Sequence, residues 1–155
     1  MKQPLVVVAV VLAVIALVSS LFVPRPERAT AQQLNLEFQL KGYLNSRHSP
    51  LSNEISYLLE QEHWKLLIAV SAIESQFCTK QVGFNCWGVT QLDGKYRRFE
   101  SLREGIKETN DLIERWQNRG RWLTVNDMNC HYVQPCNPNW VKVVNKVLGE
   151  LAIYE

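Results

Sequence analysis

The stretch LLIAVSAIESQF, residues 66–77, decides the fold. It is apolar on almost every side of a helix and delivers a single carboxylate, Glu74, near its end. A helix that is apolar all round lies in a protein core. We therefore predict a central buried helix whose last turn holds Glu74 at the edge of the core. Low polarity raises the pKa of a carboxyl group, which suits a general acid. The simpler alternative is that Glu74 is an ordinary solvated residue at a helix end.

The segment after this helix combines polar, aromatic and turn residues. Asn85-Cys86-Trp87-Gly88 forms a polar-aromatic loop, and Asp93-Gly94 favours a tight turn between extended residues. We therefore predict one β-hairpin over residues 89–99. Ser101-Leu102-Arg103-Glu104 reads as a capping box that opens the next helix.

Further helix signals flank this region. Ser49-Pro50 is a good helix start, Thr124 to Asp127 could cap a short helix, and residues 140–151 form an amphipathic final helix. Residues 32–48 are polar and weakly patterned, and we expect a spacer that runs into a short helix at residues 40–44. The predicted architecture is a single mostly helical α+β domain over residues 49–155.

The N-terminal segment is predicted to direct export. Residues 5–23 are apolar apart from Ser19 and Ser20, which is long enough for a membrane span. Residues 5–18 followed by Ala29-Thr30-Ala31 also fit a cleaved signal peptide. We favour an N-terminal membrane anchor slightly over a signal peptide for residues 1–31. Both interpretations place the remaining chain at the cell surface or in the periplasm.

The four cysteines agree with an oxidising compartment. Four cysteines allow three pairings, and we favour the local pairs Cys78 with Cys86 and Cys130 with Cys136. A zinc site that includes His131 is the rival interpretation, but the spacings between these cysteines exceed those of usual zinc ligands. We expect disulfides and no metal.

The charge balance offers no support for nucleic-acid binding. Removing the leader takes Lys2, Arg25 and Arg28 from the seventeen basic residues and Glu27 from the fifteen acidic ones. The exported part is then formally neutral and shows no basic stripe. Binding of a polymer must therefore rest on shape, stacking and hydrogen bonds.

Several short motifs occur in an order that is typical of one superfamily. They are Ala72-Ile73-Glu74-Ser75-Gln76-Phe77, Asn85-Cys86-Trp87-Gly88, Tyr96-Arg97-Arg98-Phe99, Ser101-Leu102-Arg103-Glu104-Gly105-Ile106 and Asn137-Pro138-Asn139-Trp140. Over residues 40–151 the chain resembles the lysozyme-like superfamily of peptidoglycan-cleaving enzymes, especially small exported lytic transglycosylases and N-acetylglucosaminidases. Two positions depart from that pattern, since Cys78-Thr79 stands where these enzymes often have Gly, and Phe84 precedes Asn85.

The resemblance implies a lysozyme-like fold and a site that needs no cofactor. Glu74 would be the catalytic acid, and the glycan strand of peptidoglycan would be the partner of a monomeric enzyme. The substrate-binding residues would be Ser75, Asn85, Trp87, Tyr96 and Tyr132. Core packing is an equally good interpretation for Trp87, and a hydrogen bond to its own helix backbone is an equally good one for Ser75.

A second catalytic carboxylate does not stand out in the sequence. The candidates have simpler roles in turns, caps or solvated helix faces: Asp93, Glu100, Glu104, Glu108 and Asp111. Hydrolases with two carboxylates need such a partner, whereas lytic transglycosylases use one Glu as acid and then base. The sequence thus favours a lytic transglycosylase over a hydrolytic muramidase or N-acetylglucosaminidase. A catalytically inactive wall-binding module and a disulfide-stapled interaction domain are the non-enzymatic alternatives.

Overall fold

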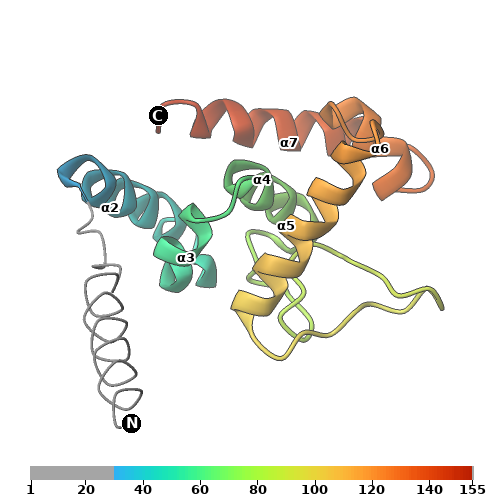
Figure 1. The fold of residues 1–155 in the computed structure, drawn as a ribbon, viewed down its shortest axis with the longest axis horizontal. Helices are drawn as coiled ribbons and strands as arrows, with labels where there is room; N and C mark the ends of the chain where they lie inside the picture. The colour runs from blue at the N-terminus through green and yellow to red at the C-terminus, as the bar shows by residue number, and fades with distance from the viewer. Residues whose placement is uncertain (1–29, 155) are drawn as a thin grey trace, which may run out of the picture. The chain divides into compact units, whose positions relative to one another are not determined.

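The computed structural model describes residues 30–154, so the predicted leader lies outside the described residues (Figure 1). Residues Ala31–Glu155 form one compact unit. Within the described part, no helix is both long and apolar enough to cross a bilayer. The helices are α2 (Ala31–Asn45), the 3-10 helix η1 (Pro50–Glu54), α3 (Ile55–Leu59), α4 (Trp64–Ser75), α5 (Leu102–Asn118), α6 (Val125–Tyr132) and α7 (Pro138–Leu151).

Helix α4 is the centre of this mostly helical unit. Its buried residues are Leu67, Ile68, Ala69, Val70, Ser71 and Ser75. It packs most extensively against α7 and also against α5, which runs beside it in Figure 1. The predicted central buried helix is therefore present, and its C-terminal turn carries Glu74.

Helix α2 corrects the prediction that residues 32–48 form a spacer with a short helix. The helix begins at Ala31, and Leu40 and Leu44 on its inner side are completely buried. Leu34 and Phe38 remain exposed, so this helix buries only its C-terminal half. The alternating apolar residues at positions 34, 36, 38 and 40 concealed the helical period, because only the last of them faces the core.

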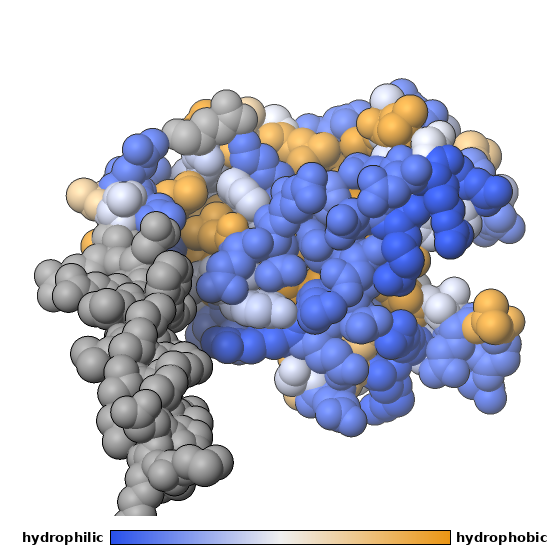
Figure 2. Space-filling model, viewed as in Figure 1, coloured by the Kyte–Doolittle hydropathy of each residue, from blue (hydrophilic) through white to orange (hydrophobic). Residues whose placement is uncertain are grey.

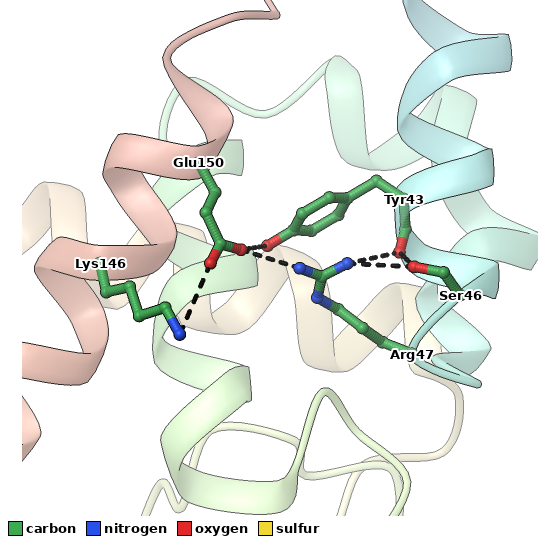
Figure 3. A network of polar contacts seen from close by, with 5 residues as sticks. All are labelled: Tyr43, Ser46, Arg47, Lys146 and Glu150. Atoms are coloured by element: carbon green, nitrogen blue, oxygen red, sulfur yellow. Dashed lines mark hydrogen bonds and ion pairs between the residues drawn. The ribbon is translucent and has the colours of Figure 1, made fainter.

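A polar network joins the end of α2 to α7 (Figure 3). The Tyr43 hydroxyl and the Arg47 guanidinium each donate to Glu150 at 2.8 Å. The guanidinium also lies 3.6 Å from the centre of the Tyr43 ring. Burial and the hydrogen bond to Glu150 raise the pKa of Tyr43 far above its ordinary value. These contacts make α2 part of the folded unit.

Three helix starts use the predicted capping residues. Ser49 accepts from the Leu51 amide before Pro50, and Thr124 forms a complete capping box with Asp127. Ser101 accepts from the Glu104 amide at 3.1 Å, but the Glu104 carboxylate accepts from the Glu100 amide rather than from that of Ser101. The predicted start of α5 is confirmed, but the Glu104 side chain bonds to the residue before the cap instead of to the cap itself.

The segment between α4 and α5 carries little regular structure. The described residues contain no β-strand, only isolated antiparallel bridges between Val82 and Asn85 and between Thr90 and Tyr96. A turn with Gly94 at φ 79° closes the second bridge. This segment projects from the helices in Figure 1, and Figure 2 shows an apolar spot at its outer end. Within the segment, Leu92 is fully exposed. The predicted hairpin is reduced to this bridged loop.

Candidate functional site

The C-terminus of α4 places Glu74 at an abrupt change of chain direction. Gln76, Phe77 and Cys78 follow with φ values of 52°, 56° and 70°, in the left-handed region that L-residues seldom adopt in succession. The Gln76 and Phe77 amides both donate to the Ser71 carbonyl, which satisfies the helix end. The turn sends the chain into the loop that faces Glu74.

Both carboxylate oxygens of Glu74 meet residues from distant parts of the chain. The Trp140 indole N–H donates to Oε1 at 2.7 Å. Oε2 lies against Gly88, where an added Cβ would stand 2.7 Å from it. The helix end, the loop and α7 thus converge on one carboxyl group.

The environment of Glu74 raises the pKa of its carboxyl group. Burial raises the pKa of this carboxyl, and the hydrogen bond from Trp140 lowers it by a smaller amount. The residue still reaches solvent, so its proton can be exchanged and a substrate can approach. A carboxyl with a raised pKa keeps its proton to higher pH than an ordinary glutamate, and its open face lets it deliver that proton to a bound substrate.

Replacing Trp140 with Phe removes a hydrogen bond that favours ionised Glu74. The pKa of Glu74 should then rise further, and the alkaline limb of the pH–activity profile should move to higher pH. The smaller ring should also lower the free energy of unfolding by about 1–2 kcal/mol. A pH–rate profile of the two proteins measures the first effect. An unchanged alkaline limb would contradict the proposed contact.

Gly88 is required by the backbone and by the space beside Glu74. Its φ is +67°, in the region where glycine has no steric penalty. The position after it, Val89, is held by Asn85. A side chain at position 88 would therefore displace the carboxylate rather than the loop.

Replacing Gly88 with Ala should lower activity about a hundredfold, because misplacing a catalytic group by about 1 Å has effects of that size. Gly94→Ala is the matched control, since Gly94 has φ +79° but open space where the Cβ would be. Both variants strain a left-handed position, so their unfolding free energies should fall by similar amounts. Equal activity losses would show that the contact with Glu74 does not matter.

Both predicted disulfides are present. Cys78 pairs with Cys86 and Cys130 with Cys136, with Cα atoms 4.7 and 4.4 Å apart. All four thiols are consumed, so none is available for the rival zinc site. The first disulfide is buried and ties the turn after Glu74 to the loop that carries Gly88. The second closes the chain between α6 and the start of α7.

Asn85 holds the loop together and is not free to bind a sugar as predicted. Its Nδ2 donates to the carbonyls of Val89 and Arg97 at 2.7 and 2.8 Å. Its Oδ1 accepts from the amides of Trp87 and Val89. An Asn amide has two donors and two acceptor sites, so the loop backbone uses all of them. Asn85 therefore shapes the pocket without an available polar group.

Trp87 corrects the prediction of a stacking residue. Its ring is completely buried, and its indole N–H donates to the Leu67 carbonyl at 2.9 Å. The ring anchors the loop to α4 because it has an apolar body and a polar edge that needs a partner. Trp87 supports the site from below, as the core-packing alternative described.

Ser75 ties the helix end to the loop. Its hydroxyl lies 2.7 Å from the Cys86 carbonyl and 3.2 Å from the Ser71 carbonyl, and it accepts from the Cys78 amide at 3.0 Å. The residue is 5% exposed. Its hydroxyl is thus engaged with backbone groups, which makes it a positioning residue for the turn after Glu74.

The two predicted tyrosines occupy different places. Tyr96 is 63% exposed and lines the pocket beside Glu74. Tyr132 lies behind the site, where its hydroxyl donates to the Trp87 carbonyl and its ring packs 5.7 Å from that of Trp140. Burial, and then the charge of Glu74, raise the pKa of Tyr132. Only Tyr96 is available for stacking against a ligand.

A pocket of about 140 Å³ opens at this carboxyl group. It brings together four of the predicted site residues and three residues that had no predicted role in the site. Lys80 is one of the residues without a predicted role. The lining residues are Glu74, Ser75, Lys80, Val82, Asn85, Gly88 and Tyr96.

The other carboxylates near the loop are engaged elsewhere. Asp93 accepts from the Lys95 amide in the turn, and Glu108 pairs with Arg97 at 3.0 Å. Asp111 pairs with Lys107 on the same helix. Among the described residues that line the pocket, Glu74 is the only acid.

Comparison with known proteins finds no matching family model and no curated protein of significantly similar sequence.

Proposed function

We propose that the protein cleaves the glycan strand of peptidoglycan, with Glu74 as its acid and base, and that it acts as a lytic transglycosylase. The observation that supports this most is the Glu74 carboxyl itself. It has a raised pKa, is oriented by Trp140, and opens into a pocket whose lining, among the described residues, holds no other acid. The proposal includes a lysozyme-like arrangement of the domain, in which a buried helix presents the acid to a loop-lined cleft.

The first chemical step uses protonated Glu74. Its proton passes to the glycosidic oxygen as the bond from that oxygen to the sugar C1 breaks. The N-acetyl group of the same sugar supports the positive charge that develops at C1. Glu74 is left ionised, and the Trp140 N–H at 2.7 Å stabilises this form.

The second step needs a base, and Glu74 is the group in place. The ionised carboxylate takes the proton from the sugar C6 hydroxyl as its oxygen bonds to C1. The product is a 1,6-anhydro end, and Glu74 is protonated again. One carboxylate completes this cycle. A pocket in which Glu74 is the only acid among the described lining residues therefore favours a transglycosylase over a two-carboxylate hydrolase.

We further propose that the domain acts outside the cytoplasm, attached through or released from the apolar N-terminal segment. Two disulfides within Ala31–Glu155 support an oxidising compartment. Peptidoglycan is located in that compartment, so the location and the substrate agree.

Digestion of purified sacculi in water enriched in ¹⁸O distinguishes the two reaction types. A lytic transglycosylase should release fragments with anhydro ends that contain no heavy oxygen. A hydrolase should release reducing ends that each gain one ¹⁸O atom, because water attacks C1. The masses of the fragments decide between them, and the absence of fragments at any enzyme concentration would contradict the proposed function.

A further inference from the structure

Lys80 lies in the Glu74 pocket without an assigned role. It lines the pocket together with Glu74, Val82 and Tyr96, and it is exposed. Its backbone is fixed, since its amide donates to the Ser75 carbonyl at 2.9 Å and the neighbouring Cys78 is held by a disulfide. The fold therefore holds a lysine at the opening beside the acid.

Lys80 differs from some of its basic neighbours in its ion pairing. Within residues 30–154, no ion pair includes Lys80. By contrast, Lys95 on the adjacent turn pairs with Asp93 at 3.2 Å, and Arg97 pairs with Glu108. Arg98, whose side chain covers Gly83 beside the pocket, also has no ion pair in this part of the chain.

We propose that Lys80 forms a subsite for a substrate carboxylate. This inference rests on the proposed function and identifies the part of the glycan that the pocket binds. An ammonium on a flexible stem binds a carboxylate as a point charge. Partial enclosure strengthens the attraction relative to bulk water, and the pocket of about 140 Å³ accommodates a sugar substituent near the reacting bond.

Peptidoglycan offers this carboxylate from two sources. The lactyl group on C3 of muramic acid ends in a free carboxylate wherever the stem peptide has been removed. Where the peptide is present, that carboxyl is an amide and the remaining carboxylates belong to the peptide. N-acetylglucosamine carries neither a lactyl carboxylate nor a stem peptide. The subsite therefore binds muramic acid in preference to N-acetylglucosamine.

Binding measurements in the Glu74→Gln background test the subsite without turnover. The ligands are peptide-free glycan strands, peptide-bearing strands, and both after conversion of their carboxylates to methylamides. The proteins compared are Glu74→Gln alone and with Lys80→Met or Lys95→Met. Lys95→Met removes the same charge from a residue outside the pocket, so it is the matched control.

Lys80→Met should weaken binding of carboxylate-bearing strands about three- to tenfold, the range for a partly solvated charged contact. It should leave binding of the amidated strands unchanged, and Lys95→Met should change neither. The strand type that shows the loss identifies the source of the carboxylate. Equal effects on native and amidated strands, or no effect on either, would overturn the inference. Failure of the parent protein to cleave sacculi would instead count against the proposed function.

Discussion

Replacing Glu74 with Gln should lower the rate of glycan cleavage about a thousandfold, within the range for the loss of a general acid. Gln keeps the size of the side chain and an oxygen that can accept from Trp140, but it can neither donate the proton nor remove it later. Release of soluble fragments from sacculi measures the rate.

The same substitution should not unfold the protein. Burial raises the pKa of Glu74 in the folded state, so the folded protein binds this proton more tightly than the unfolded chain does. Its stability therefore falls as pH rises through the window between the unfolded and folded pKa values. Glu74→Gln should be at least as stable as the parent above that window. Glu108→Gln, which breaks an exposed pair with Arg97, is the control and should keep nearly full activity.

Removing the buried disulfide with Cys78→Ala and Cys86→Ala should lower the free energy of unfolding by about 2–4 kcal/mol. This disulfide holds the left-handed turn after Glu74 against the loop that carries Gly88. Activity should fall more than the unfolded fraction explains, because the pocket loses its shape. Denaturant unfolding and the specific rate under folding conditions measure the two effects.

The disulfide between Cys130 and Cys136 provides the matched comparison. It closes a chain of similar length, with a sequence separation of 6 rather than 8, so the chain-entropy effect should be similar. Its cysteines are exposed and do not line the pocket. Its removal should lower stability with a smaller loss of specific activity. Equal activity losses in both double variants would contradict the role assigned to the buried disulfide.

Local sequence signals predicted the parts of the fold that local chemistry determines. The apolar run at residues 66–77 became α4, and Ser49, Ser101 and Thr124 cap helices because each offers an oxygen to unpaired amides. The first half of helix α2 was missed because it has no core to face. Its Leu34 and Phe38 remain exposed, so their spacing gave no helical period that could be recognised.

In the candidate site, the sequence indicated Glu74 but not its contact with Trp140, which comes from a distant part of the chain. Glu74 was identified from its place at the end of an apolar helix. Trp140 is far away in the chain and is itself buried, so its polar edge could not be assigned to Glu74 from the sequence. Trp87 and Asn85 share residue types with ligand-binding positions, but their polar groups bond to the chain itself. Whether such a residue binds a ligand or supports the fold depends on its burial, which these residue types alone do not reveal.

We propose that Glu74 makes this protein a peptidoglycan-cleaving enzyme. The most direct measurement incubates purified sacculi with the oxidised protein and, in parallel, with Glu74→Gln, followed by mass spectrometry of the released material. We predict fragments with 1,6-anhydro-muramyl ends from the parent protein and about a thousandfold less from the variant. Equal release by the two proteins, or no release by either while both bind the sacculi, would contradict the claim.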